Sequence, residues 1–266
     1  MELIIIDDGS SDASNHYENI INQYFSTLAE GNITKIEILT KDQNMGIVDS
    51  CLLGIELATG EYINFKSVDD LYCNNLQLIL EEMKQSDMEI VQFPYLFYNQ
   101  LKHYLQYIKP TDSFFEKDSG SQYQCLLKKH NIVVGACIFK SNVLKEDLRK
   151  KRIQQFKYSF ERPLILELAK EKHRINVSKT RLPLYCYIRN KDSVSNWLFK
   201  SDLFFREQQL LKELYGIYDS NHKSDILSRV INKIHLRLLK SNTKLRLSLV
   251  NEQKLLNSDL DWNSLN

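Results

Sequence analysis

The feature that most constrains the fold is an unbroken aliphatic run at the start of the chain, followed at once by a polar, acidic loop. Residues 3–6 are leucine and isoleucine, and residues 7–12 contain three aspartates, two serines and a glycine. A strand that is apolar on both faces is typical of a parallel sheet covered on both sides. Ser11 or Asp12 can then cap a helix that extends to about Ala29. The start of the chain therefore predicts a strand, a polar loop and a helix.

The same alternation of strand and helix continues through the first hundred residues. The expected elements are strands at 33–39, 62–65 and 89–97, and helices at 47–58 and about 74–86. Strands that alternate with helices predict an α/β fold with a doubly wound, mostly parallel sheet flanked by helices. Ligands of such sheets gather at the carboxyl ends of the strands, and Asp7-Asp8 and Asp69-Asp70 both fall at such ends.

The rest of the chain is less regular until its C-terminal part, which has helical periodicity. Residues 98–131 are interpreted as an irregular excursion. The elements expected after it are a strand at 132–139, a helix at 164–172 that begins near Pro163, a strand at 184–188, and helices at 198–216 and 222–250. The sequence thus predicts two regions, an α/β domain at residues 1–196 and a helical C-terminal region at residues 197–266.

The composition is that of a globular protein and excludes several functional classes. Hydrophobic residues make up 43% of the 266 residues, and the net charge is only +1, so no nucleic-acid partner is expected. The five cysteines lack the spacing of a zinc site and are interpreted as buried residues in a reducing compartment. No apolar run approaches the roughly 20 residues of a membrane span, so we expect a soluble, cytoplasmic protein.

The two acidic pairs are the strongest candidates for a ligand site. Carboxylates accept hydrogen bonds from ribose hydroxyls and base N–H groups, and they also bind hard cations, so a metal-bridged diphosphate is the obvious ligand. Each pair also has a purely structural interpretation. Asp8 and the residues after it can form a turn and a helix cap, and Asp69-Asp70 can lie in a solvated loop.

The order of these motifs resembles the signature of family 2 glycosyltransferases. The motifs that carry the resemblance are residues 4–12, Asn44-x-Gly46, residues 58–65 and Asp69-Asp70, followed more faintly by residues 135–140, Phe160-Glu161, Tyr185-x-Tyr187-x-Arg189, Ser193 and Ser195. Each motif is weak alone, but their order and spacing over residues 2–72 are specific. The resemblance covers residues 2 to about 196 and implies a GT-A, Rossmann-like fold.

The resemblance also implies an activity and roles for particular residues. The activity is transfer of a sugar, with inversion, from a nucleoside-diphosphate sugar to a glycan or lipid-linked acceptor, with a UDP-sugar as the first choice of donor. Asp8, with Asp7 beside it, would recognise the nucleobase. Asp69 would bind Mg²⁺ or Mn²⁺, and Ser67 and Asp70 would contact the donor next to the metal.

The same resemblance makes Glu161 the candidate base that deprotonates the acceptor hydroxyl. Three positions depart from the family pattern: Ser67 replaces the first aspartate of D-x-D, Cys51 replaces a frequent arginine, and Arg162 replaces the second acidic residue of a Glu-Asp pair. Glu161 can be the base displaced by one position, or it can pair with Arg162 or a nearby lysine at the surface. The family's first strand and helix are also missing, so we expect an N-terminally incomplete domain.

These departures support a second hypothesis, a degenerate relative that acts as a binding or assembly module without catalysis. A nucleotidyltransferase would share the sheet and the metal chemistry, but residues 60–63 and the Tyr-x-Tyr-x-Arg segment disfavour it. The helix expected at 222–250 has an apolar stripe and a basic face. It either packs on the domain, which we favour, or lies on the inner face of the membrane, near lipid-linked acceptors.

Overall fold

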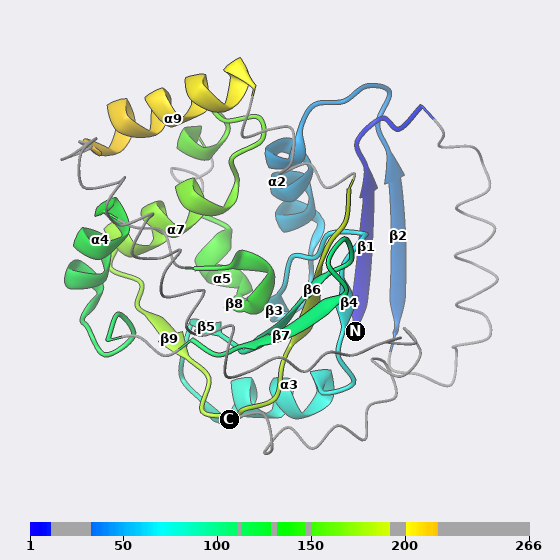
Figure 1. Ribbon diagram of the computed structural model, residues 1–266, viewed down its shortest axis with the longest axis vertical. Helices are drawn as coiled ribbons and strands as arrows, with labels where there is room; N and C mark the ends of the chain where they lie inside the picture. Colours follow the sequence, from blue (N-terminus) through cyan, green and yellow to red (C-terminus); the bar gives the residue numbers. More distant parts are fainter. Residues whose placement is uncertain (12–32, 111–112, 129–131, 147–150, 192–200, 218–266) are drawn as a thin grey trace.

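The computed structural model describes residues 1–11, 33–110, 113–128, 132–146, 151–191 and 201–217 (Figure 1). The helix expected up to Ala29, the basic helix expected at 222–250, and Ser193 and Ser195 therefore lie outside the described residues. Among the helices that the structure describes, none is long and apolar enough to cross a membrane.

The first strand–loop–strand–helix unit agrees with the sequence-based expectation. Strand β1 (Glu2–Asp7) pairs in parallel with β2 (Lys35–Thr40), and helix α2 (Ile47–Leu57) packs against β1. Figure 1 shows the two strands side by side, with α2 next to β1. The helix buries Val48 and Ile55, which lie seven residues apart and thus on the same helical face.

A four-stranded sheet forms the centre of the domain. Its strands lie in the order β3 (Tyr62–Ile63), β8 (Cys137–Lys140), β5 (Ile90–Gln92) and β9 (Ile175–Val177). Successive side chains alternate between two apolar clusters on its faces: Ile90 and Phe139 belong to one, and Val91 and Ile138 to the other. A sheet buried on both faces is what the near-continuous apolar strands predict.

A second four-stranded sheet lies beside the first. It has the order β4 (Leu71–Tyr72), β10 (Tyr185–Arg189), β6 (Tyr95–Asn99) and β7 (Tyr104–Ile108). Residues 89–97, expected as one strand, divide at Pro94 into β5 and β6. The amide of Phe93 still donates to the carbonyl of Ala136, but the carbonyl of Pro94 accepts from Leu184. Proline has no N–H to donate, so the chain changes partner here.

Helices cover the central sheet on both faces. One cluster packs residues of α2, α4 (Ser119–Lys128), α5 (Ser141–Leu144), α7 (Glu161–Lys170) and α9 (Asp202–Tyr215) against the central strands. The other cluster includes α3 (Leu76–Gln85). The short 3₁₀ helix η1 (Val134–Ala136) occupies the first half of the strand expected at 132–139. The α/β class with flanking helices is therefore confirmed.

The strand directions add a detail that alternation of elements did not reveal. The pairs β1–β2, β10–β6 and β5–β9 are parallel, whereas β10–β4, β3–β8, β5–β8 and β6–β7 are antiparallel. One of these antiparallel pairs, β6–β7, is a hairpin with a short connection, whereas the strands of the other three pairs lie far apart in the sequence. A short link can join antiparallel neighbours, whereas parallel neighbours need a long crossover.

Hydrogen bonds of the Glu2 side chain join the start of β1 to the residues after α2, and replacement of Glu2 tests their contribution to stability. Its carboxylate accepts from the Thr59 amide at 2.8 Å and from Lys35 Nζ at 2.9 Å, and these bonds lower the pKa of Glu2 to about 2. Because the pKa is lowered on folding, the stabilisation is present above about pH 4.5 and is lost as the pH falls toward 2. We expect Glu2→Gln to reduce the free energy of unfolding by about 1–2 kcal/mol at pH 7.

Denaturant unfolding at pH 7 and at pH 3 measures this effect. Glu37→Gln is the matched control, because it removes the other carboxylate that contacts Lys35 and leaves Thr59 untouched. The control should change the free energy of unfolding by less than about 0.5 kcal/mol. An equal loss at both pH values for Glu2→Gln would contradict the assigned ionic role of this side chain.

Candidate functional site

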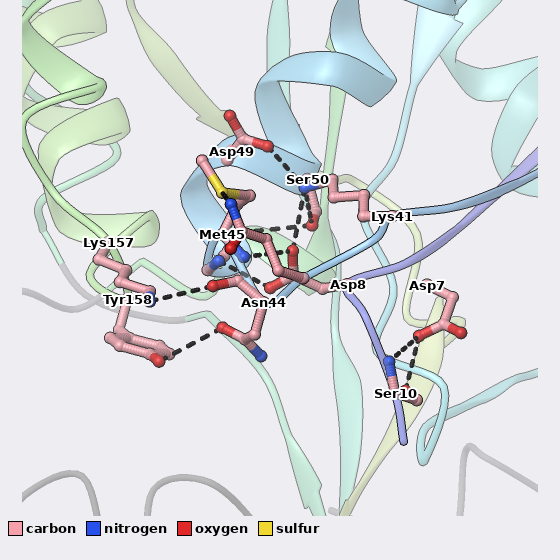
Figure 2. A network of polar contacts seen from close by, with 12 residues as sticks. Asp7, Asp8, Ser10, Lys41, Asn44, Met45, Asp49, Ser50, Lys157 and Tyr158 are labelled. Atoms are coloured by element: carbon pink, nitrogen blue, oxygen red, sulfur yellow. Dashed lines mark hydrogen bonds and ion pairs between the residues drawn. The ribbon is translucent and has the colours of Figure 1, made fainter. Parts of the chain in front are cut away.

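Asp8 lies directly after β1 and is the centre of a polar network at the carboxyl ends of β1 and β2. Its carboxylate accepts from Lys41 Nζ at 3.0 Å and from the amides of Met45 and Gly46 at 3.0 and 2.7 Å. Figure 2 shows these bonds converging on Asp8. Burial raises the pKa of Asp8, but Lys41 and the two amides together outweigh burial, so the pKa lies below its ordinary value.

Lys41 joins this network to the first turn of α2. Its ammonium also donates to Asp49 Oδ2 at 2.6 Å and to Ser50 Oγ at 2.8 Å. The side chain of Lys41 is only 13% exposed, so its charge depends on these partners. An open hollow of about 320 Å³ is lined by residues 40–43 and Met45, on the same turn.

Asp7 points away from Asp8, so the two carboxylates do not form a single pair (Figure 2). Neighbouring residues at the end of a strand face opposite sides. Asp7 Oδ1 accepts from the amide and hydroxyl of Ser10 at 3.0 and 2.6 Å, which closes the turn after β1. Its other oxygen, Oδ2, is buried and has no hydrogen-bond partner among the residues that the structure describes. Asp7 therefore forms the expected turn, and one of its oxygens remains without a partner in the described part of the chain.

Two glycines allow the backbone of this region to pack without side chains between the segments. Gly9 has φ of 75°, and a Cβ atom there would lie 2.5 Å from the backbone of Gln43. Gly46 has φ of 99°, and a Cβ atom there would lie 2.4 Å from the carbonyl oxygen of Lys157. Both the positive φ and the close contact exclude other residues. The glycines thus bring the loop after β1, the turn at residues 44–46 and the segment at Lys157 together.

The second acidic pair ends a tight turn between β3 and β4. The amide of Asp70 donates to the carbonyl of Ser67 at 3.2 Å, which leaves Ser67 and Val68 exposed at the tip and Asp69 half-buried. Asp70 is buried, and its Oδ1 accepts from the amide of Ile188 on β10 at 2.9 Å. The pKa of Asp70 is raised to about 6, first by burial and then by Asp69.

Glu161 is the first residue of α7 and lies within electrostatic range of Asp70. Its pKa is raised to about 7, first because protein surrounds the carboxyl group on many sides and then because of Asp70, although a hydrogen bond with the Val134 backbone opposes this. The residue is nevertheless exposed to solvent. Water that reaches the carboxylate stabilises its charged form, so the shift is smaller than complete burial would give. A carboxylate that solvent can reach and whose pKa is raised toward neutral pH is suited to proton transfer.

Two further side chains connect the predicted site residues. Tyr185 on β10 lies within electrostatic range of both Asp70 and Glu161, and burial and these charges raise its pKa. The charges of Glu161 and Lys41 both act on Cys51 of α2: burial and Glu161 raise its pKa to about 12, while Lys41 acts in the opposite direction. The thiol is therefore protonated at neutral pH.

The structure thus brings some sequence-predicted residues together and separates others. Asp69, Asp70 and Glu161 lie in one group, although about 90 residues separate the pair from the glutamate. Asp8 lies in the network formed with Lys41 and the amides of Met45 and Gly46. Asp7 faces away from Asp8.

The residues present fit a divalent cation that shares its coordination with a ligand. Among the described residues there is no group of three or more histidine, cysteine, aspartate or glutamate side chains that could hold a metal alone. Mg²⁺, however, is usually held by one or two carboxylates together with substrate phosphates. Asp69 is half-exposed and Asp70 has one oxygen bonded to Ile188, so a shared site is compatible with both.

Sequence reasoning missed three residues that the structure places in or around the site. Lys41 directly follows β2, so its position at a strand end was a usable signal. Tyr185 was noticed only as part of a motif, and its contact with both carboxylates depends on the pairing of β10 with β4. Glu207 lies on α9, and nothing in the local sequence distinguishes it from the other charged residues of that helix.

The fold is similar to that of a solved structure of low sequence identity. Superposition on the crystal structure of TarS from S. aureus gives a TM-score of 0.51 at 15% identity, covering 84% of this chain and 39% of that one. The crystal structure of TarS 1–349 in complex with UDP gives 0.49 at 15% identity, covering 84% and 64%. The chain therefore spans less than two thirds of the length of these structures. A comparison with curated proteins gives no match.

These observations show that the fold is that of a GT-A type α/β domain. Residues 1–163 match the family described as Glycosyl transferase family 2, which is more than half of the chain. The chain therefore belongs to glycosyl transferase family 2. The matched segment includes both acidic pairs and Glu161, and it ends inside α7.

Proposed function

We propose that this protein transfers a sugar, with inversion, from a nucleoside-diphosphate sugar to a glycan or lipid-linked acceptor, with a UDP-sugar as the first donor to test. The observation that supports the proposal is the electrostatic interaction of Asp70 with both Asp69 and Glu161, because a cation-binding carboxylate and a base with a raised pKa could then share one site. Family membership supports the reaction class.

Each residue of the group has a distinct proposed role. Asp69, half-exposed at the turn, would hold Mg²⁺ or Mn²⁺, and the exposed hydroxyl of Ser67 would bond the donor ribose. When bound, the cation would offset the negative charge that develops on the departing nucleoside diphosphate. Asp70 joins the turn to β10 by accepting a hydrogen bond from the Ile188 amide, and its charge raises the pKa of Glu161. Glu161 would accept the proton of the acceptor hydroxyl.

The loop after β1 is proposed to bind the nucleobase. Asp8 already accepts three hydrogen bonds, and a carboxylate has about four acceptor positions, so roughly one remains for a base N–H. Asp7 Oδ2, which has no hydrogen-bond partner among the described residues, is buried on the other side of the strand end and would have to become exposed to contact the nucleotide. The open hollow at residues 40–43 lies next to Asp8 and offers space for a planar ring.

A second candidate function is a binding or assembly module without catalysis. It is favoured by the small number of carboxylate oxygens that this turn offers to a metal ion. Ser67 stands where a carboxylate would add charge, and one oxygen of Asp70 is already bonded to the backbone. In that case nucleotide binding would persist without sugar transfer or donor hydrolysis. Detecting a transferred sugar or a hydrolysed donor, with a UDP-sugar or a GDP-sugar, would exclude this candidate.

The place of action follows from the acceptor. A lipid-linked acceptor would bring the protein to the inner face of the membrane, where the basic helix expected at 222–250 would meet anionic lipid. A glycan acceptor would leave it in the cytoplasm.

Calorimetric titration of UDP-sugars and GDP-sugars, with and without Mn²⁺, tests the donor and metal sites together. We expect binding that strengthens with Mn²⁺, and we expect Asp69→Ala to remove this dependence and weaken binding about tenfold or more. Val68→Ala is the matched control, because this side chain lies in the same turn and is 99% exposed. If Asp69→Ala bound the donor with unchanged metal dependence, the assignment of Asp69 would be wrong.

A further inference from the structure

A buried carboxylate on α9 accepts hydrogen bonds from three successive amides next to the site. Glu207 is only 5% exposed, and its oxygens accept from the amides of Lys157, Tyr158 and Ser159 at 2.7, 2.9 and 2.8 Å. Three adjacent amides that point at one carboxylate form an anion-binding loop, here filled by the protein's own side chain. Hydrogen bonds to a charged group are the stronger kind, so this contact fixes the loop firmly.

The segment held by Glu207 also contacts the turn that binds Asp8. The Lys157 carbonyl accepts from the amide of Val48, and Lys157 Nζ donates to the carbonyl of Asn44 at 3.1 Å. The Tyr158 hydroxyl reaches Asn44 Oδ1 at 3.4 Å, as Figure 2 shows. Residues 157–159 therefore lie between α9 on one side and the Asn44–Gly46 turn on the other.

The same segment leads directly into the candidate base. Phe160 follows it as the N-cap of α7, and Glu161 is the first residue of that helix. The ring of Phe160 packs edge-on against Phe65, with 5.1 Å between ring centroids, just before the turn that carries Asp69. The position of residues 157–159 therefore determines where α7 begins, and with it the position of Glu161 relative to the acidic turn.

We propose that Glu207 is a positioning residue of the active site: its carboxylate holds residues 157–159, and through them it places both Glu161 and the Asp8-binding turn. The inference rests on the proposed function for its catalytic consequence. It extends the site to α9, which lies beyond the residues that match the family. It also gives α9 a role in the chemistry of the site.

Two variants of Glu207 separate positioning from simple packing. Glu207→Gln keeps the volume but replaces one acceptor oxygen with an NH₂ group that faces an amide donor. Glu207→Asp keeps the charged acceptor but is shorter by one methylene. Positioning through hydrogen bonds predicts that glutamine is the more damaging change, whereas a packing role predicts the reverse. Glu213→Gln is the control, because Glu213 is exposed on the same helix, where it accepts a hydrogen bond from Gln209 Nε2 at 2.9 Å.

Hydrogen–deuterium exchange of the full chain is the first readout, and it is independent of any activity. We expect Glu207→Gln to accelerate exchange at residues 157–161 and 44–48 by about tenfold or more, with a smaller effect for Glu207→Asp and none for the control. Unchanged exchange in these two segments, or equal acceleration throughout the chain, would overturn the inference.

Transfer kinetics with a UDP-sugar and Mn²⁺ are the second readout. We expect Glu207→Gln to lower kcat about 100-fold at a temperature where the variant is fully folded, because small displacements of a catalytic group have effects of that size. Glu207→Asp should recover part of this loss. A kcat close to wild type for Glu207→Gln would contradict positioning. An inactive wild-type protein would instead refute the proposed function, and the exchange experiment would still decide the role of Glu207.

Discussion

Replacing Glu161 with glutamine is expected to lower the rate of sugar transfer by about 10²- to 10⁴-fold, the usual contribution of a general base. Glutamine has nearly the same shape as glutamate but cannot accept the proton of the acceptor hydroxyl. Nucleotide binding should remain within about twofold of wild type, because the proposed partner of Glu161 is the acceptor hydroxyl, whereas the nucleobase is proposed to bind at Asp8. Steady-state transfer rates and calorimetric titration of UDP measure the two quantities.

The pH dependence of the wild-type rate provides a second test of Glu161. A base must be deprotonated, so the rate should fall as the pH drops through the pKa of this group. That pKa is raised to about 7 by the surrounding protein and by Asp70, and solvent access moves it back toward 4.5, so the acid limb should lie between these values. Glu81→Gln, which replaces an exposed carboxylate on α3 with an amide, is the control and should keep the wild-type profile. Full activity of Glu161→Gln would show that another group accepts the proton.

The parts of the fold that the sequence predicted well are those with strong local patterns. The aliphatic residues of β1 and the apolar face of α2 define these elements without help from the rest of the chain. The expected strand at 89–97 was wrong as a single element because Pro94 transfers the chain from β8 to β10, and that transfer depends on strands more than 40 residues away. Local periodicity carries no information about such partners.

The candidate site follows the same division. Asp69 and Asp70 were selected from the sequence as the end of an expected strand at 62–65, although the structure places them in the turn before β4, and Glu161 was selected by resemblance. Their grouping depends on β10, whose backbone binds Asp70, and on the segment at Lys157, which leads into α7. Asp7 and Asp8 look equivalent in the sequence, but the pleat at the end of β1 turns them to opposite sides. Their different partners could not be read from the residue types.

Asp8 is the position where loss of stability and loss of binding are expected to coincide. Its carboxylate holds Lys41 and the amides of Met45 and Gly46, and its side chain is 21% exposed. Asp8→Asn removes the charge and turns an NH₂ group toward donors, which leaves at least one buried donor without an acceptor. We expect the free energy of unfolding at pH 7 to fall by about 3 kcal/mol, as for a broken, partly buried ion pair.

The acid range distinguishes this ionic role from a change in packing. The pKa of Asp8 is lowered on folding, so its stabilisation is present above about pH 4 and is lost as the pH falls below that value. The difference between wild type and Asp8→Asn should therefore shrink in acid, whereas a packing defect would persist. Asp42→Asn, an exposed change in the same loop, should leave stability within about 0.5 kcal/mol. UDP binding, measured under conditions where both proteins are folded, then tests the nucleobase contact separately. If Asp8 serves only to stabilise the loop, Asp8→Asn will bind UDP as the wild type does.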